Sequence, residues 1–545
     1  MNSLVPPEGG KPRAGLAETG GGSVSGVGVP QQKAHHWLQT GFAEMSAQAT
    51  FDEPSLHTSG LLARFAEFTL TSTALILQVA LWVIFNSWFS SLREDILRTR
   101  VHNVGCFICP TCCLCAAASL ALSCLLFGSQ AELIGHWDGT MVREGARLEV
   151  SFDFTTSETQ LKGTFTSLTQ QAMDFPLAVV TVDADMVHLV LGDSLVFDGK
   201  LGTNEITGSF TDDGAKGDFT LHRTKRPVLP YDSVDVTFPN GPVTLAGTLC
   251  TPRSTERHPA VVLLQGSGGE TRWGTNRFIA DRFARLGIAA LVYDKRGSGT
   301  STGDWKSSSY DDLANDALAG IDLLASRSDI DPKRIGLHGH SEGGIIAPIA
   351  AMHAPSKVAF IVAEDTVAGF VRDQDIYRVS HAIREAGFTD SEIQHAMAMY
   401  MLMLDVACGR KPYRELETAS QPVRDQKWYE WLGIPPADSY LWSWYPKIGN
   451  LDSLVFWKQV HVPVLLVYGE LDELVPVDES LAKIEASLEA AKTPYTAIIV
   501  PGAQHNLTVR PDEGGLFFWW KSAPGLIDLV AAWIQQRTGL PVTLH

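Results

Sequence analysis

The sequence is short of basic residues and, over most of its length, of cysteine. Lys and Arg number 43 against 61 Asp and Glu, a net charge of −18, and only 19% of the residues are charged. A polyphosphate backbone binds to a basic face, so this balance argues against a nucleic-acid partner. Six of the eight cysteines lie between positions 106 and 124, which leaves Cys250 and Cys408 for the rest of the chain. A fold held by a disulfide framework is therefore excluded.

Residues 1–67 lack the apolar periodicity of a helix or a strand. Gly, Ser, Ala, Gln and Pro dominate this stretch, so we expect a disordered low-complexity tail. The chain as a whole has 545 residues, of which 45% are apolar. That length exceeds one compact core, and two or three domains are expected.

Residues 68–131 hold two long apolar stretches, at 68–89 and 104–127, that contain no charged residue. A helix over the first stretch would be about 33 Å long, against a hydrocarbon core of roughly 30 Å. The second stretch also resembles a signal peptide, with arginines before it and small residues at 129 and 131. A membrane anchor and a cleaved signal therefore both stay open. Its cysteines are surrounded by Ala and Leu, which disfavours a metal site.

Both interpretations place the remainder of the chain outside the cytoplasm. Three arginines lie in the 91–100 loop, whereas the tail near the first stretch offers only Arg64. We expect residues after 131 to be exported, periplasmic or extracellular, with membrane contact through 68–128. Signal peptides begin a chain, so we hypothesise that the natural start lies after the assigned one. No Met occurs between Met45 and Met141, so that start would need a non-Met codon.

Residues 132–226 change to short alternating runs separated by Gly, Asp and Asn. This period of two, with frequent turn signals, predicts an antiparallel sheet, sandwich or partial barrel. Because the segment shows no nucleophile–base pair, we expect a structural or substrate-presenting accessory domain. Recognition of a polymer or lipid surface is the alternative. Pro227 and Pro230 mark the linker that follows.

Residues 233–545 alternate between predicted strands and helices, which is typical of an α/β domain with a mostly parallel sheet. The motif Gly339-His-Ser341-Glu-Gly343 lies between a predicted strand at 334–338 and a predicted helix at 345–354. A G-x-S-x-G motif in this context predicts a nucleophile elbow, in which flanking glycines allow a sharp turn. Ser341 is therefore the candidate nucleophile.

A serine nucleophile needs a base, and the base needs an acid that orients it. Asp472 and His505 each follow a predicted strand, at 462–468 and 496–500. Parallel sheets place their sites at these strand ends. We therefore predict Asp472 as the orienting acid and His505 as the base. Glu470 and Glu473 remain alternatives for the acid.

Attack by a serine nucleophile also requires a pair of hydrogen-bond donors for the oxyanion that develops on the substrate. We predict the backbone N–H groups of Ser267 and Glu342. The Gly-rich loop 266–269 lacks the Lys-Ser/Thr of a phosphate-binding loop. No metal or cofactor is expected. Asp294 and Arg296 are interpreted as residues that hold their own loop.

These motifs resemble the α/β-hydrolases of the serine-aminopeptidase-like, EstD-type esterase branch, over about residues 234–539. The motifs that carry the resemblance are Leu263-Leu-Gln-Gly-Ser-Gly-Gly269, Tyr293-Asp-Lys-Arg-Gly-Ser-Gly299 with Ser301-Thr-Gly303, Gly339-His-Ser-Glu-Gly343, Gly469-Glu-Leu-Asp472 and Gly502-Ala-Gln-His505. The resemblance implies an α/β-hydrolase fold, and members can carry a β-rich domain before it. Gln265 departs from the pattern, because many relatives have His there.

An insertion at about 365–460 is the usual place for a helical cap, and its second half is rich in Trp and Tyr. Such aromatic clusters more often pack than bind, but they would also suit an apolar acyl or aryl group. We predict a serine hydrolase that cleaves carboxylic esters of small molecules through an acyl-enzyme. A serine aminopeptidase or acyl-peptide hydrolase is the first alternative. A membrane-tethered, non-catalytic binding protein is the second.

Overall fold

The structure is a computed structural model that describes residues 131–542, apart from 158–159, 213 and 510–520. The predicted tail at 1–67 and the apolar stretches at 68–89 and 104–127 lie outside the described residues. Among the helices that are described, none has both the length and the apolar character needed to cross a membrane.

The predicted β domain is a closed barrel of eight antiparallel strands. Its strands are β1 (Gly135–Arg143), β2 (Ala146–Ser157), β3 (Gln160–Ser167), β4 (Ala172–Asp183), β5 (Met186–Leu191), β6 (Leu195–Leu201), β7 (Glu205–Asp212) and β8 (Ala215–Thr224). Each strand pairs with the next, and β1 pairs with β8 to close the barrel. Closure leaves no free edge strand in this sheet.

Aromatic rings fill the inside of the barrel. In β2, alternate residues from Ala146 to Phe154 are buried, as expected when one face of a strand points inward. The ring of Phe197 meets Phe152 and Phe219 edge to face, with centroids 5.3 and 5.4 Å apart. This geometry suits the quadrupoles of aromatic rings. The barrel interior is therefore a packed core.

The second domain is built on an eight-stranded sheet in the order β16-β15-β14-β13-β11-β12-β10-β9. Its strands are β9 (Tyr231–Asn240), β10 (Val243–Pro252), β11 (His258–Leu264), β12 (Ala289–Tyr293), β13 (Ile330–His340), β14 (Ile361–Glu364), β15 (Val464–Gly469) and β16 (Tyr495–Val500). The six strands from β11 onward pair in parallel, and β9 and β10 form an antiparallel edge. The carboxyl ends of these six strands therefore meet at one edge of the sheet.

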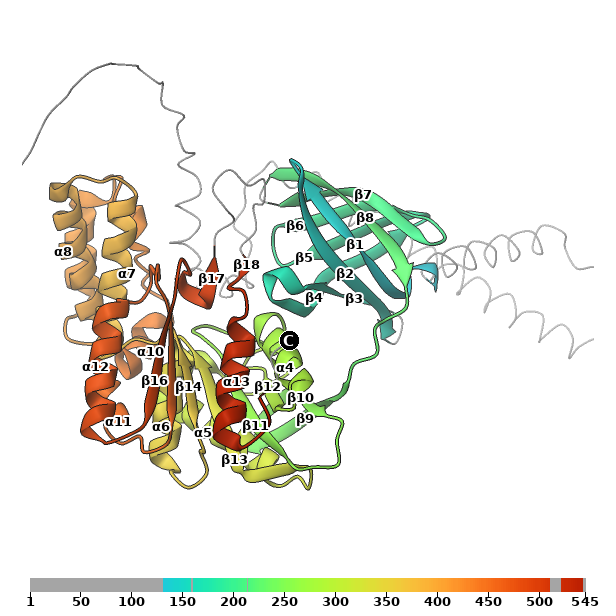
Figure 1. The fold of residues 1–545 in the computed structure, drawn as a ribbon. Helices are drawn as coiled ribbons and strands as arrows, with labels where there is room; N and C mark the ends of the chain where they lie inside the picture. Colours follow the sequence, from blue (N-terminus) through green and yellow to red (C-terminus); the bar gives the residue numbers. More distant parts are fainter. Residues whose placement is uncertain (1–130, 158–159, 213, 510–520, 543–545) are drawn as a thin grey trace, which may run out of the picture.

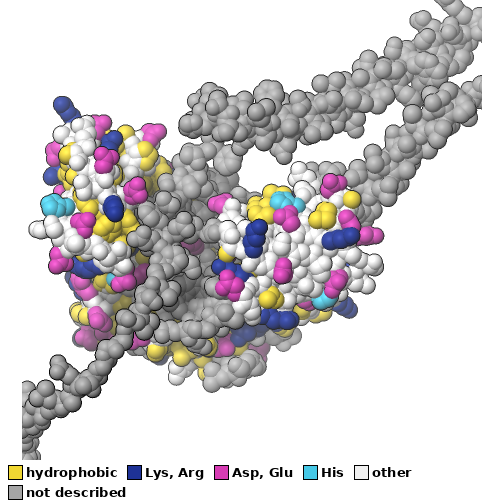
Figure 2. Space-filling view, turned by 90° about the horizontal axis from the view of Figure 1, so that it is seen from above, with side chains coloured by type: hydrophobic (Ala, Val, Ile, Leu, Met, Phe, Trp, Pro, Cys, Tyr) yellow, Lys and Arg dark blue, Asp and Glu magenta, His cyan; other side chains and the backbone are white. Residues whose placement is uncertain are grey.

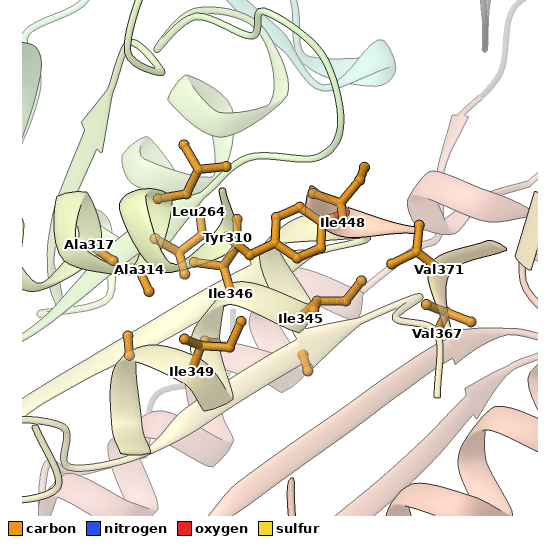
Figure 3. Close-up of a cluster of buried hydrophobic side chains, with 14 of the residues drawn as sticks. Leu264, Tyr310, Ala314, Ala317, Ile345, Ile346, Ile349, Val367, Val371 and Ile448 are labelled. Atoms are coloured by element: carbon orange, nitrogen blue, oxygen red, sulfur yellow. The ribbon is translucent and has the colours of Figure 1, made fainter. Parts of the chain in front are cut away.

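Helices cover both faces of this sheet, which explains why its strands are apolar throughout. In β11, Ala260 and Val262 enter one core while Val261 and Leu263 enter the other. The helices are α4 (Thr275–Arg285), α5 (Tyr310–Ala325), α6 (Glu342–His353), α12 (Val477–Ala490) and α13 (Leu526–Thr538). Residues of α4 and α13 pack on one face, and residues of α5, α6 and α12 pack on the other. Figure 3 shows part of the core between the sheet and helices α5 and α6, where Tyr310 lies among isoleucines of α6.

The predicted cap region forms a set of helices between β14 and β15. They are α7 (Val371–Glu385), α8 (Asp390–Ala407), α9 (Tyr413–Ser420), α10 (Leu441–Ile448) and α11 (Leu454–Trp457). Figure 1 shows α7 and α8 rising beyond the sheet on the side away from the barrel. Seen from above, the barrel and these helices show side chains of both charge signs, interspersed (Figure 2). Cys250 and Cys408 are buried free thiols.

Strand β4 brings the barrel against the second domain. The N–H of Gly274, just before α4, donates to a carbonyl of β4 at 3.1 Å. Arg277 Nε lies 3.2 Å from Asp174 Oδ2, and the Arg277 side chain is 3% exposed. The Gln171 amide also donates to the Ser522 hydroxyl in the short strand β18 (Lys521–Ser522). The barrel therefore contacts segments next to both the loop after β11 and the turn after β16.

Candidate active site

Ser341 lies in a sharp turn between β13 and α6. Its backbone has φ +52° and ψ −113°, a conformation that costs a residue with a Cβ. A Cβ on Gly339 would lie 2.2 Å from the Gly343 carbonyl oxygen, and one on Gly343 would lie 2.5 Å from the Leu264 carbonyl oxygen. The turn therefore requires glycine on both sides of the serine.

Hydrogen bonds to the sheet and to α6 fix this turn. The Ser341 N–H donates to the Glu364 carbonyl at the end of β14 (2.8 Å), and the Ser341 carbonyl accepts from the Gly344 N–H (3.0 Å). Glu342 begins α6, so the positive end of the helix dipole lies beside the serine. Negative charge that develops here would be stabilised.

Asp472 and His505 meet at the carboxyl ends of β15 and β16. His505 Nδ1 lies 2.8 Å from Asp472 Oδ2. The other oxygen, Asp472 Oδ1, accepts the N–H groups of Leu474 (2.8 Å) and Val475 (2.9 Å). Both side chains are buried, at 0% exposure for Asp472 and 6% for His505. The carboxylate is held by the backbone and faces the imidazole.

The surroundings favour the charged form of His505. Burial lowers the pKa of His505, but the charge and hydrogen bond of Asp472, followed by Asp365 and Glu473, raise it to about 9. An opposite charge at this distance stabilises an imidazolium. A proton taken up at Nε2 would therefore be stabilised by Asp472 across the ring.

The two alternative acids interact with backbone N–H groups and not with the His505 ring nitrogen that Asp472 contacts. Glu470 Oε2 accepts the N–H of Gly502 at 2.8 Å. The pKa of Glu473 is raised by its burial and by the nearby charge of Asp472. Of the three carboxylates, Asp472 is the one 2.8 Å from the His505 ring.

The loop 266–269 lies against the serine turn. A Cβ on Gly266 would lie 3.8 Å from Ser341 Cβ and 3.5 Å from His340 Nδ1. Ser267 is exposed, and its hydroxyl lies 3.5 Å from Glu342 Oε2. The two predicted oxyanion donors, Ser267 and Glu342, thus come from neighbouring segments.

A buried lysine joins these two segments. Lys295 Nζ lies 2.7 Å from Glu342 Oε1 and also donates to the Gly266 carbonyl. Both charged side chains are nearly inaccessible, at 4% and 3% exposure. The pKa of Tyr310 is raised by burial, and its hydroxyl is hydrogen-bonded to the Glu342 carboxylate. Lys295 therefore ties the loop after β11 to the first residue of α6.

The neighbours of Lys295 hold their loop, as the sequence indicates. Arg296 Nε lies 2.6 Å from Asp316 Oδ2. Asp294 accepts the N–H groups of Arg272 (2.9 Å) and Thr300 (3.0 Å). Gln265 is buried and donates to the Tyr293 carbonyl, so this departure from the pattern joins the ends of β11 and β12.

The cap aromatics mostly pack against one another and against the α/β domain. Trp444 meets Trp305 edge to face at 5.8 Å, and its indole N–H donates to the Ser308 carbonyl at 3.1 Å. Trp428, Trp431, Tyr445 and Trp457 are also buried. One cap residue contacts the site directly, because the Tyr377 hydroxyl in α7 lies 3.4 Å from the Asp472 carbonyl oxygen.

Sequence reasoning missed Asp365 and gave Lys295 no role. Asp365 directly follows β14, between the strand that leads to Ser341 and the strand before Asp472. The rule that located Asp472, a polar residue just past a parallel strand, applies equally to Asp365. Lys295 lies in the loop that the sequence analysis interpreted as structural.

Comparison with known proteins agrees with this architecture. The model of the Alpha/beta hydrolase family matches residues 261–514. An uncharacterized protein of Mycobacterium tuberculosis is 26% identical over 248 residues, which is 46% of this chain and 63% of that protein. The chain thus spans less than two thirds of the length of this relative.

Two further proteins show the range of similarity. A bifunctional esterase/perhydrolase of Acinetobacter calcoaceticus is 24% identical over 42% of this chain and 80% of its own length. The solved structure of acetyl xylan esterase 1 from Thermoanaerobacterium covers 58% of this chain and 86% of its own, with 15% identity and a TM-score of 0.35. The sheet order, the strained serine turn and the family match over residues 261–514 together show that the second domain has the α/β-hydrolase fold.

Proposed function

We propose that this protein is a serine hydrolase that cleaves carboxylic esters through an acyl-enzyme intermediate. The observation that carries the proposal is the buried contact between His505 Nδ1 and Asp472 Oδ2 at 2.8 Å, at the same sheet edge as the strained turn of Ser341. A hydroxyl is a weak nucleophile at neutral pH, and a base oriented by an acid activates it. The relative named as an esterase/perhydrolase also supports the proposal.

In the first half of the reaction, Ser341 Oγ attacks the ester carbonyl carbon. His505 Nε2 takes the hydroxyl proton, because Nδ1 is engaged with Asp472. The carbonyl oxygen becomes an oxyanion and accepts hydrogen bonds from the backbone N–H groups of Ser267 and Glu342. Collapse of this intermediate breaks the bond to the alcohol oxygen, and His505 gives its proton to the leaving alcohol.

In the second half, water takes the place of the alcohol. His505 removes a proton from the water, whose oxygen attacks the acyl carbon. The acid leaves, and the proton returns to Ser341. Asp472 keeps the ring in one tautomer and stabilises its charged form in both halves. No step requires a metal or a cofactor.

We propose an apolar acyl or aryl group for the substrate. Two exposed apolar side chains lie in the segments that follow β14 and β15: Phe370, just before α7, at 36% exposure, and Leu471, next to Asp472, at 56%. Binding pockets are mostly apolar with a few polar anchors. A panel of nitrophenyl esters of increasing chain length tests this, and highest kcat/KM for acetyl with a steady fall at longer chains would contradict it.

The test of the reaction is Ser341→Ala. We expect loss of nitrophenyl ester turnover by roughly 10⁴-fold or more, since the nucleophile is removed. Ser391→Ala, at an exposed position near the start of α8, is the matched control and should leave kcat unchanged. Undiminished turnover in Ser341→Ala would refute the assignment.

Two alternatives are separated by their own measurements. An aminopeptidase or acyl-peptide hydrolase would cleave aminoacyl or acylpeptidyl nitroanilides faster than nitrophenyl esters. A non-catalytic binding protein would fail to react with a fluorophosphonate at Ser341. We expect fluorophosphonate labelling of the parent, no labelling of Ser341→Ala, and preference for the esters.

We further propose that residues after 131 act outside the cytoplasm, as the arginines of the 91–100 loop suggest. Protease treatment of spheroplasts, whose outer layer has been opened, followed by detection of the catalytic domain, tests this. Protection of the domain in spheroplasts but not in lysed cells would contradict it.

A further inference from the structure

A second buried carboxylate lies beside the Asp472–His505 pair. Asp365 follows β14, and β14 is hydrogen-bonded between β13 and β15. Asp365 therefore ends the strand that separates Ser341 from Asp472. Its side chain has no exposed surface, and its backbone φ is +47°, which is uncommon outside glycine. The backbone at Asp365 therefore adopts an energetically unfavourable conformation that holds this carboxylate in place.

Asp365 lies close to two histidine rings. A carboxylate oxygen of Asp365, a ring nitrogen of His340 and a ring nitrogen of His505 all lie within 4.8 Å of one another. The rings of His340 and His505 have centroids 5.0 Å apart. Asp365 is thus within one small side-chain movement of a hydrogen bond to either imidazole.

Of the two carboxylate oxygens of Asp365, one has a hydrogen-bond partner among the described residues. Asp365 Oδ1 accepts the N–H of Gly469, the last residue of β15, at 2.8 Å. Asp365 Oδ2 and His340 Nε2 are buried and have no hydrogen-bond partner among the described residues. Buried polar atoms of native proteins normally have a partner, and an unpaired one points to a role other than packing.

The neighbouring buried pair shows the contrast. His338 Nε2 lies 3.0 Å from Glu364 Oε1, one strand position away, with both side chains buried. The pKa of Glu364 is lowered, because His338 and His340 outweigh the effect of burial, which raises it. Glu364 therefore has a histidine at ion-pair distance, although Glu364 Oε1 and His338 Nε2 make no well-aligned hydrogen bond. Asp365 Oδ2 has neither a hydrogen bond nor an ion pair among the described residues.

Burial, together with the carboxylates of Asp472 and Glu364, favours the neutral form of Asp365. Burial raises its pKa well above the usual value; His505 opposes this, and Asp472 and Glu364 add to it. Burial and the nearby His505 lower the pKa of His340 to about 3, against smaller opposing effects of Glu364 and Asp472. Two like carboxylates beside one imidazolium do not both need to ionise. Removal of Asp472 would leave Asp365 as the nearest buried carboxylate to the His505 charge.

We propose that Asp365 is a positioning residue of the His505 site: a second carboxylate that takes over the orientation and charge stabilisation of His505 when the Asp472 contact is broken. The inference rests on the proposed hydrolase function. Asp365 is expected to contribute little while Asp472 is present and much when Asp472 is absent.

A double-mutant cycle tests this, with Asp365→Asn measured in the parent and in Asp472→Ala. Asn keeps the size of the side chain and an oxygen for the Gly469 N–H, but it cannot carry the charge. The readouts are the rate of fluorophosphonate labelling at Ser341 and the pH profile of kcat/KM for a nitrophenyl ester. Thermal melting of each variant shows whether it is folded.

We expect Asp365→Asn to slow labelling less than about threefold in the parent and about 100-fold in Asp472→Ala, within the range of measured couplings between contacting groups. In Asp472→Ala, the His505 pKa that governs the rise of kcat/KM with pH should fall further when Asp365 is replaced. Glu364→Gln is the matched control, a buried carboxylate engaged by His338, and should cost the same factor in both backgrounds. Rescue by Asp365→Glu in the Asp472→Ala background would support orientation through the carboxylate.

Equal factors for Asp365→Asn in the two backgrounds would overturn the inference while leaving the proposed function intact. A parent protein that reacts with no fluorophosphonate and turns over no ester would overturn the proposed function, and the inference with it. The two failures are therefore distinct.

Discussion

The barrel and the α/β domain both bury large cores, but they bury different kinds of groups. The barrel core consists of apolar side chains, with Phe152, Phe197 and Phe219 at its centre. The α/β domain also buries charges at or near its strand ends: Lys295 with Glu342, Arg296 with Asp316, and His505 with Asp472. Burial of a charge is costly even when it is paired.

The barrel core therefore adds to stability, whereas the charges buried in the α/β domain lower the stability of that domain. The barrel carries its histidine–carboxylate pairs between strands, and two of them are well exposed, His188 with Asp198 and His222 with Glu205. In the α/β domain, the pairs His338–Glu364 and His505–Asp472 are sealed from water, whereas the pair His353–Asp311 is partly exposed. Low exposure strengthens electrostatic interactions and allows the pKa of a base to be set by its neighbours.

Of the variants that test this comparison, Asp472→Asn should produce the largest effect, because it removes the buried charge that orients His505 in the proposed mechanism. We expect kcat to fall by roughly 10³- to 10⁴-fold. A base is active when neutral, so the parent's kcat/KM should rise with pH as His505 loses its proton through about 9. Without the Asp472 charge, this limb should move to lower pH.

The control is Glu470→Gln, which replaces an exposed carboxylate bonded to the Gly502 N–H. It should change kcat by less than about twofold, the usual size of surface effects. A loss in Glu470→Gln equal to that of Asp472→Asn would show that the acid has been assigned to the wrong residue.

Lys295→Met tests whether the buried ion pair serves stability as well as geometry. It leaves the Glu342 carboxylate buried without its cation, which should lower the free energy of unfolding by about 3–5 kcal/mol. We also expect a fall in kcat of about 10²-fold, because the loop after β11 is released from α6. Denaturant unfolding and ester kinetics measure both.

The exposed pair of Lys357 and Asp322 is the comparison for this variant. Lys357→Met should cost no more than about 1 kcal/mol. Adding Glu342→Gln to Lys295→Met should restore part of the lost stability by removing the isolated charge. If Lys295→Met and Lys357→Met cost the same, the contrast between sealed and exposed pairs fails.

Phe197→Ala should damage the barrel alone. Removal of this ring leaves a cavity between Phe152 and Phe219, at a cost of about 3 kcal/mol. Turnover per folded molecule should stay at the parent level, since the barrel contributes packing here. Val179→Ala, at an exposed position on β4, should change stability by less than about 0.5 kcal/mol. A loss of kcat in folded Phe197→Ala would mean that the barrel core shapes the active site.

Arg277→Met tests the boundary between the two domains and should give the smallest effect. The side chain joins Asp174 of the barrel and the Tyr231 hydroxyl, so its loss should cost about 2 kcal/mol through unpaired buried groups. Thermal unfolding should separate into two transitions as the domains uncouple. Arg253→Met, at the exposed pair with Asp232, should leave a single transition.

Much of the α/β domain could be predicted from local sequence. Buried parallel strands such as β11 are continuous apolar runs, and the strand–Gly-x-Ser-x-Gly–helix pattern marks the turn at Ser341. Asp472 and His505 were predicted by the same strand-end rule, and the structure brings them within 2.8 Å.

Features that depend on distant pairing could not be predicted in this way. The barrel closes because β1 pairs with β8, more than 70 residues away, and alternation alone does not distinguish a closed barrel from a sandwich. The Lys295–Glu342 contact spans 47 positions and leaves no local pattern. Asp365 was within reach of the strand-end rule but was counted as the beginning of the cap.

The closed barrel also bears on how such a chain avoids aggregation while it folds. Each of the eight strands pairs with two neighbours within the barrel, so a chain that emerges N-terminus first can complete this unit before the parallel sheet forms. Antiparallel neighbours in sequence assemble sooner than parallel strands that wait for distant partners. Throughout that wait the barrel offers no strand edge on which the unfinished domain, or another chain, could template a mispaired sheet.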